Sequence, residues 1–171
     1  MSDADAAVLV IMGVAGSGKS TIGRLLADRL GWELAEGDEL HPEANVAKMA
    51  AGQPLTDADR WPWLARVRAW IDEHVAAGRP GVITCSALKR AYRDVLRDPH
   101  VVFVHLAGTR DQLAARLAAR RGHFMPVSLL DSQLADLEPP GPDERALTVD
   151  ISAPPAEQAT AIVLARASGP R

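Results

Sequence analysis

Residues 13–20 read GVAGSGKS and match the pattern G-x-x-x-x-G-K-[ST], in which a glycine-rich loop ends in lysine and a hydroxyl residue. The preceding residues 8–12, VLVIM, have the continuous apolar character of a strand buried on both faces of a parallel sheet. The following residues 19–30 fit a helix that ends at Gly31. A chance glycine-rich turn would not require this order of strand, loop and helix, so we interpret the segment as a phosphate-binding loop.

The chemistry of phosphate binding explains the residue types in this loop. Glycines let successive backbone N–H groups point inward at phosphate oxygens, and the helix that follows adds its positive N-terminal end. Lys19 is expected to reach the β- and γ-phosphates, and the Ser20 hydroxyl is expected to bind Mg²⁺. The sequence therefore predicts a site for ATP and Mg²⁺. Its predicted members are Gly13, Ala15, Gly16, Ser17, Gly18, Lys19, Ser20 and Thr21.

Predicted strands and helices alternate along the chain. Apolar runs predict strands at residues 8–12, 32–36, 81–85, 101–106 and 147–151. Capping signals and closing glycines help to predict helices at residues 19–30, 42–51, 58–77, 87–96, 109–121 and 156–167. This alternation predicts a three-layer α/β fold, in which a five-stranded parallel sheet carries helices on both faces. The length of 171 residues suits a single domain.

Composition limits the partners and the compartment. The formal net charge of −3 argues against nucleic acid as the main partner, because such binding needs a basic face. The lone cysteine, Cys85, excludes an intrachain disulfide and fits a reducing compartment. The acidic N-terminus has no basic segment, and its apolar run at residues 8–12 is too short for a signal peptide or a membrane span. A cytoplasmic protein without membrane partners is the expectation.

Two carboxylates lie at the carboxyl end of the second predicted strand, in the segment EGDELHP at residues 36–42. Ligands of open α/β sheets bind at the carboxyl ends of the strands, so Glu36 and Asp38 are placed where an acceptor would lie. Phosphorylation of a hydroxyl needs a carboxylate to orient it and accept its proton, which suits Asp38. Glu36 could hold Mg²⁺ through water. Taken alone, the pair is better explained as a solvated acidic turn, and only the rest of the chain favours the functional interpretation.

Several cations later in the chain have more than one interpretation. Arg116 and Arg120 lie four apart on one predicted helix face, where they could stack on a base and reach phosphates, or simply form a solvated basic face. Spacing alone assigns no role to Arg60, Lys89 and Arg93, and it leaves two histidines open as turn residues. Those histidines are His41 and His123. Small size, an early phosphate loop and an arginine-rich later helix favour a kinase of small metabolites or nucleotides.

The chain closely resembles the small P-loop gluconate kinases, the gluconokinases. The resemblance covers nearly the whole chain in the order of that family. Its motifs are residues 13–20, GDELHP at 37–42, Asn45, Lys48, Met49, GQPLTDADR at 52–60, PWL at 62–64, CSALK at 85–89, YRD at 92–94, RRGHF at 120–124, Gln133, Leu137, EP at 138–139 and Asp150. A phosphate loop is generic, but GDELHP, CSALK and RRGHF together are specific to gluconokinases.

The resemblance implies a P-loop fold of the nucleoside-monophosphate-kinase and shikimate-kinase type, in a homodimer. The implied reaction is direct, in-line transfer of phosphate from ATP to the 6-hydroxyl of D-gluconate. Its products are ADP and 6-phosphogluconate, which would enter the pentose phosphate pathway. The implied acceptor side is residues 42–78, and the implied lid is residues 122–128.

The resemblance also implies roles for single residues. Lys19, Asp38 and Arg120 would be catalytic, with Asp38 facing the acceptor hydroxyl. The implied substrate contacts are Asp38, His41, Arg60, Lys89, Arg93 and His123. Arg116 would stack on adenine with Pro154 on the opposite face, and Arg120 would reach the phosphates. Many relatives have aspartate at the position of Glu36, which weakens the assignment of Glu36 to Mg²⁺ without affecting the fold.

Two alternatives stay open at this point. A related kinase could phosphorylate shikimate or a nucleoside monophosphate, although GDELHP and CSALK together are not expected in such an enzyme. An ATP-binding module could instead switch a partner without turning over a metabolite. The polar residues of the acceptor side favour the enzyme, because a switch would give them no role.

Overall fold

The computed structural model describes residues 8–120 and 127–168. Its sheet has five strands, which are β1 (Val8–Met12), β2 (Glu33–Glu36), β3 (Gly81–Thr84), β4 (Val101–Ala107) and β5 (Ala146–Asp150). They lie in the order β2-β3-β1-β4-β5, and every neighbouring pair is parallel. The predicted five-stranded parallel sheet is confirmed, with strand bounds that differ from the prediction by one residue at most.

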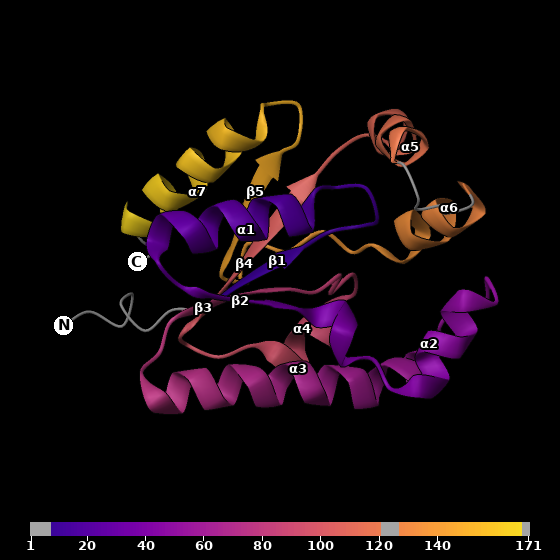
Figure 1. Cartoon of the computed structure of the whole chain (residues 1–171), viewed down its shortest axis with the longest axis horizontal. Coiled ribbons are helices and arrows are strands. Elements are labelled where there is room, and N and C mark those ends of the chain that lie inside the picture. Colours follow the sequence, from indigo (N-terminus) through magenta and orange to yellow (C-terminus); the bar gives the residue numbers. More distant parts are fainter. Residues whose placement is uncertain (1–7, 121–126, 169–171) are drawn as a thin grey trace.

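Helices cover both faces of this sheet (Figure 1). Helices α1 (Lys19–Leu30) and α7 (Pro155–Ser168) lie together on one face, and α3 (Asp57–Ala77) and α4 (Arg90–Leu96) lie together on the other. The remaining helices are α2 (Glu43–Ala50), α5 (Arg110–Ala119), α6 (Val127–Asp136) and the 3-10 helix η2 (Gly37–Leu40). Helices α2, α5 and α6 lie toward the end of the sheet where the strands terminate (Figure 1). The phosphate loop, which follows β1, opens at the same end.

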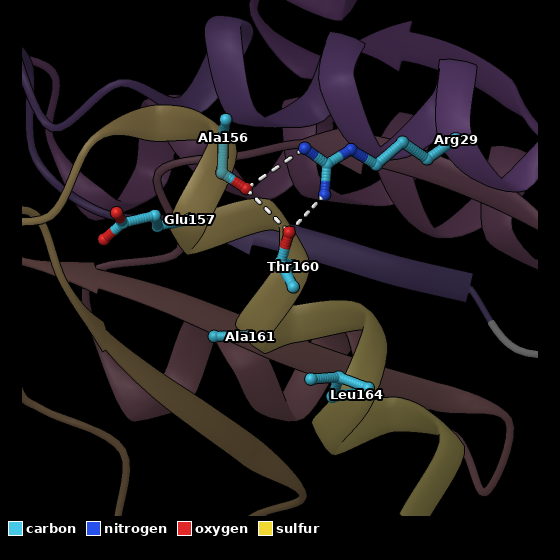
Figure 2. Close-up of a pocket in the computed structure, with 6 residues that line it drawn as sticks. All are labelled: Arg29, Ala156, Glu157, Thr160, Ala161 and Leu164. Carbon is cyan, nitrogen blue, oxygen red and sulfur yellow. Dashed lines mark hydrogen bonds between the residues drawn. The ribbon is translucent and has the colours of Figure 1, made fainter.

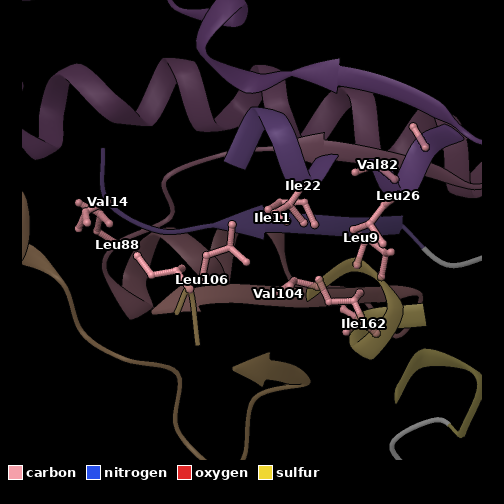
Figure 3. Close-up of a cluster of buried hydrophobic side chains, with 14 of the residues drawn as sticks. Leu9, Ile11, Val14, Ile22, Leu26, Val82, Leu88, Val104, Leu106 and Ile162 are labelled. Atoms are coloured by element: carbon pink, nitrogen blue, oxygen red, sulfur yellow. The ribbon is translucent and has the colours of Figure 1, made fainter. Parts of the chain in front are cut away.

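Alternating strand residues supply two hydrophobic cores, one on each face of the sheet. Leu9 and Ile11 of β1 pack with Ile22 and Leu26 of α1, together with Val104 of β4 (Figure 3). On the opposite face, side chains from β1 and β3 pack against α3 and α4. That second core is formed by Val8, Val10, Met12, Trp63, Leu64, Val67, Ile71, Ile83, Tyr92, Leu96 and Phe103, among others. Because β1 is buried on both faces, its end point, and with it the phosphate loop, is held firmly.

Two helices differ from the sequence prediction. Helix α6 was not predicted, because residues 127–136 have no clear capping signal. The helix expected at residues 87–96 begins only at Arg90, since the segment before it forms a loop in which Ala87 adopts a left-handed φ of 45°. Alanine rarely adopts this conformation, so surrounding contacts must hold the loop in place.

A pocket between α1 and α7 lies apart from the predicted functional residues (Figure 2). Arg29 joins the two helices there, with Nη1 donating to Thr160 Oγ1 over 2.6 Å and Nη2 donating to the Ala156 carbonyl over 3.1 Å. This arrangement fixes α7 against α1. In the part of the chain that the structure describes, no helix is long and apolar enough to cross a membrane.

Candidate nucleotide and acceptor site

The phosphate loop packs directly against helix α5. Gly16 has a φ of +83°, and a Cβ atom there would lie 3.0 Å from Leu117 Cγ and 3.1 Å from the Leu113 carbonyl. Only glycine fits both this backbone conformation and this approach. Ser17 Oγ is buried in the loop and has no hydrogen-bond partner among the described residues. A buried hydroxyl of this kind is ready to bind a phosphate oxygen.

Lys19 lies folded over the loop. Its ammonium donates to the Gly13 carbonyl over 2.9 Å and to the Val14 carbonyl over 3.1 Å. Burial lowers the pKa of Lys19, while the Asp38 carboxylate acts in the opposite direction. The negative charge of Asp38, which follows β2, therefore stabilises the charged form of Lys19 at the place where the loop would bind phosphates.

Two hydroxyl groups and one carboxylate form a cluster that joins the loop to the ends of two strands. Ser20 Oγ donates to Glu36 Oε2 over 3.0 Å, and Thr84 Oγ1 donates to the same oxygen over 2.6 Å. Hydroxyl and carboxylate oxygens are the hard ligands that Mg²⁺ prefers. No group of three or more His, Cys, Asp or Glu side chains within residues 8–120 and 127–168 could hold a metal by itself. These oxygens therefore fit a Mg²⁺ ion that keeps waters and phosphate oxygens among its ligands.

Asp38 is positioned by the glycine before it. A Cβ atom at Gly37 would lie 2.1 Å from the Thr84 carbonyl, so no larger residue fits there. The Gly37 carbonyl accepts a hydrogen bond from Trp63 Nε1 over 2.8 Å. Asp38 itself is exposed at the start of η2, and its charge opposes the lowering of the pKa that burial causes at both Lys19 and His41. The carboxylate thus lies within electrostatic reach of the phosphate loop and of the acceptor side.

His41 is held in one orientation and one tautomer. Its ring stacks on Trp63, with centroids 4.1 Å apart and planes 16° apart. Asn45 Nδ2 donates to the Asp59 carbonyl over 2.8 Å, which identifies this atom as the amide nitrogen, and it lies 3.1 Å from His41 Nδ1. Nδ1 therefore accepts, and the proton of the neutral ring is on Nε2. Burial lowers the pKa of His41, which favours this neutral form.

Arg60 and Lys89 share one set of acidic and phenolic partners. Arg60 Nη1 donates to the Tyr92 hydroxyl over 2.8 Å, and that hydroxyl donates to Asp57 Oδ1. Lys89 Nζ donates to the same Asp57 oxygen over 3.2 Å. Arg60 Nη2 also lies 3.9 Å from Asp136 Oδ2 of α6. The structure thus brings together two of the three cations that the sequence could not assign.

Arg93 is the exception, and the structure argues against its predicted contact with substrate. Its side chain is 1% exposed and forms a bidentate ion pair with Glu144. Nε donates to Oε1 over 2.7 Å, and Nη2 donates to Oε2 over 3.2 Å. Its remaining N–H groups donate to the carbonyls of Ala87, Leu88 and Glu138. All five donors are thereby occupied. Arg93 instead fixes the strained loop at Ala87, which leads to Lys89.

The residues predicted for adenine lie next to the end of strand β5, and Arg116 also lies beside the phosphate loop. Arg116 Nη2 donates to the Ile151 carbonyl over 2.6 Å, and Nη1 lies 3.5 Å from the position of a Cβ atom at Gly18. Pro154, three residues after the buried Ile151, is exposed. Arg120 ends α5 and is exposed, and its charge contributes to the lowered pKa of Lys19. His123 and most of the predicted lid at residues 122–128 lie outside the described residues.

Sequence reasoning missed several residues that shape this site. Thr84, Asp57 and Tyr92 hold the predicted side chains in place, and Gln133 contacts the phosphate loop, where its Oε1 accepts from the Ala15 N–H over 2.7 Å. Asp57, Tyr92 and Gln133 belong to the family motifs, which could have marked them as functional. No local signal identifies Thr84, because its role depends on the neighbouring end of β2.

Comparisons with known proteins find similarity to small kinases. The family model described as shikimate kinase matches residues 15–138. The gluconokinase of Gluconobacter oxydans (strain 621H) is 59% identical over 143 residues, which cover 82% of this chain and 80% of that protein. The solved structure of a gluconokinase from Sinorhizobium meliloti 1021 has a TM-score of 0.87 at 46% identity and covers 96% of this chain and 93% of that one.

A sugar kinase from Janibacter sp. HTCC2649, solved without ligand, is similar to the same extent. Its TM-score is 0.88 at 47% identity, with 96% of this chain and 99% of that chain covered. The shikimate kinase model reflects the shared P-loop fold, whereas high identity over most of the chain is found with gluconokinases. The chain therefore belongs to the gluconokinase family.

Proposed function

We propose that this protein transfers the γ-phosphoryl group of ATP to the 6-hydroxyl of D-gluconate, giving ADP and 6-phosphogluconate. One observation carries the proposal above all. A phosphate loop, the carboxylate of Asp38 and the cations Arg60 and Lys89 gather at one end of the sheet. A sugar acid has both a hydroxyl to be phosphorylated and a carboxylate to be bound, so this arrangement matches both ends of gluconate.

The nucleotide side of the mechanism stabilises the charge of the group in transfer. Loop N–H groups and Ser17 Oγ would bind phosphate oxygens, and Lys19 would leave its two carbonyl partners to bind the γ-phosphate. Arg120 would add a second positive charge. Mg²⁺, held by Ser20 and through water by Glu36, would supply further neutralisation of the phosphate oxygens when bound. Arg116 and Pro154 would hold the adenine.

The acceptor side presents the hydroxyl for in-line attack. Asp38 would accept a hydrogen bond from the 6-hydroxyl and take up its proton as the new P–O bond forms and the bond to ADP breaks. His41 would donate from Nε2 to a sugar oxygen, because its Nδ1 is already an acceptor for Asn45. Arg60 and Lys89 would bind the carboxylate of gluconate, for which guanidinium geometry is well suited.

A panel of acceptors tests the proposal directly. ADP release is measured with D-gluconate, shikimate, AMP and no acceptor, at equal ATP and Mg²⁺ concentrations, and the phosphorylated product is identified. We expect rapid ADP release with D-gluconate and with no other acceptor of the panel, and 6-phosphogluconate as the product. Preference for shikimate or AMP would reject the acceptor assignment. Slow hydrolysis that gluconate does not change would instead support an ATP-dependent switch.

Three further properties belong to the same proposal. The chain would act as a single domain whose acceptor side is formed by residues 42–78, and it would act as a homodimer in the cytoplasm. The placement of His41 and Arg60 supports the acceptor side, and a lone buried cysteine suits a reducing compartment. Light scattering of the purified protein tests the dimer, because a mass of about 18 kDa would indicate a monomer.

A further inference from the structure

Helix α6 contacts both sides of the proposed site. Gln133 Oε1 accepts a hydrogen bond from the Ala15 N–H of the phosphate loop over 2.7 Å. Asp136 Oδ2, one turn further along the helix, lies 3.9 Å from Arg60 Nη2. Residues three apart lie on the same face of a helix. A single short helix therefore contacts the nucleotide loop and an acceptor cation with one face.

The position of α6 is well fixed. Leu130 is fully buried in the core that includes β1 and α1, and Leu134 packs against that core. Just past the helix, the Glu138 N–H donates to the Leu88 carbonyl over 2.7 Å, and Glu138 Oε1 accepts from the Arg90 N–H over 2.9 Å. These bonds join the end of α6 to the loop that carries Lys89. The helix can therefore act as a spacer of constant length.

The hydrogen bond from the Ala15 N–H to Gln133 orients a whole peptide unit of the loop. The Ala15 N–H and the Val14 carbonyl belong to one peptide unit, which is planar. That carbonyl accepts from Lys19 Nζ over 3.1 Å and from the Ser17 N–H over 3.2 Å. Because the unit is planar, a bond that fixes the direction of its N–H also fixes the direction of its carbonyl. Gln133 thus orients the group that holds Lys19.

We propose that Gln133 is a positioning residue for phosphoryl transfer. It orients the Val14–Ala15 peptide unit and, through α6 and Asp136, sets the spacing between Lys19 and Arg60. The inference rests on the proposed function, since it concerns the alignment of the γ-phosphate with the acceptor. A displacement of about 1 Å between reacting groups can cost about 100-fold in rate, so a spacer between the two sites has a large effect on turnover.

Gln133→Met tests this role, because methionine has a similar length and lacks the acceptor oxygen. We expect kcat with D-gluconate to fall by about ten-fold or more, whereas the Kd for ATP and the KM for gluconate change by less than about three-fold. In Gln133→Glu a carboxylate oxygen can still accept from Ala15, so kcat should recover at least in part. The matched control is Asp131→Asn on the same helix, which loses only the exposed ion pair with Arg110 and should keep the wild-type kcat.

The kcat values of these variants either support or overturn the positioning role of Gln133. A Met variant with wild-type kcat, or one that only unfolds at a lower temperature, would overturn it. Equal loss of kcat in the Glu and Met variants would also overturn it, because the acceptor oxygen would then have no role. If the Met variant does not fold, Gln133→Asn, which is one methylene shorter, takes its place. A wild-type protein that binds ATP without phosphorylating gluconate would refute the proposed function itself, and not this role alone.

Discussion

Ser20 donates a hydrogen bond to Glu36 over 3.0 Å and so joins the first turn after the phosphate loop to the end of strand β2. Thr84 binds the same carboxylate oxygen from the end of β3. The glutamate side chain reaches the loop hydroxyl directly in this structure. Glu36 is therefore oriented toward the place where a metal ion bound by Ser20 would lie.

Glu36→Gln is expected to raise the concentration of Mg²⁺ needed for half-maximal activity by about ten-fold or more, because residues that act on a metal through water typically contribute 10- to 100-fold in affinity. Activity is titrated against free Mg²⁺ at saturating ATP. Glu36→Asp, which keeps the charge, serves as the control and should lie near the wild type. An unchanged Mg²⁺ requirement in Glu36→Gln would remove Glu36 from the metal site.

The Tyr92 hydroxyl holds Arg60 and Asp57 together, so Tyr92→Phe should disturb acceptor binding without affecting the nucleotide. Hydrogen bonds to charged groups contribute about 1.5–3 kcal/mol. We expect the KM for D-gluconate to rise about ten-fold, while the KM for ATP stays within about two-fold of the wild type. Steady-state kinetics with each substrate varied in turn measures both values. A parallel rise in the two KM values would contradict the assignment of Arg60 to the acceptor.

Arg93 should affect stability more than substrate affinity. Removal of one partner from a buried ion pair costs about 3–5 kcal/mol, so Arg93→Met and Glu144→Leu should each lower the free energy of unfolding strongly. The double variant should be destabilised by less than the sum of the two, since no unpaired charge is left buried. Urea unfolding measures all three variants. A raised KM for gluconate in a variant of normal stability would restore Arg93 as a substrate contact.

The stability of the protein should fall as the pH decreases below about 6.5. Burial lowers the pKa of both His41 and His105 from the ordinary value of 6.5, and His105 Nδ1 has no hydrogen-bond partner among the described residues. Below pH 6.5 the unfolded chain therefore binds protons that the folded chain does not, and the folded state loses stability until the lowered pKa values are reached. The pKa of Asp59, lowered to about 2 by its hydrogen bond with Lys48, affects a separate and more acidic range.

Urea unfolding at pH 7.5, 6.5 and 5.5 checks this expectation. His105→Gln removes one of the two titrating rings, so the loss of stability between pH 7.5 and 5.5 should be smaller in that variant. A free energy of unfolding that stays constant or rises as the pH falls over this range would contradict the effect of burial on the two histidines.

Much of the fold could be predicted from the sequence because its signals are local. The apolar run at residues 8–12, the loop glycines and Gly31 fix β1 and α1, and similar signals mark the other strands. Helix α6 was missed because its stability comes from packing, through Leu130 in the core, and no capping signal marks its start.

The site could be predicted only in part, for a related reason. The positions of Glu36 and Asp38 at the carboxyl end of β2 could be predicted from the strand pattern. Arg93, a charged residue near CSALK, was expected to contact substrate, but its partner Glu144 is 51 residues away and no local pattern reveals the pair. Gln133 and Ala15 are likewise 118 residues apart. Long-range partners of this kind decide which cations face a ligand and which hold the fold.

Asp38→Asn tests the central claim most directly. ADP formation is measured in the wild type and in this variant, each with and without D-gluconate, and ATP binding is measured separately. We predict that gluconate strongly stimulates ADP formation in the wild type, with 6-phosphogluconate as the product, and that the variant binds ATP with nearly unchanged affinity but loses about 100-fold or more in turnover. Near-normal turnover in Asp38→Asn, or a wild type that gluconate does not stimulate, would contradict the account.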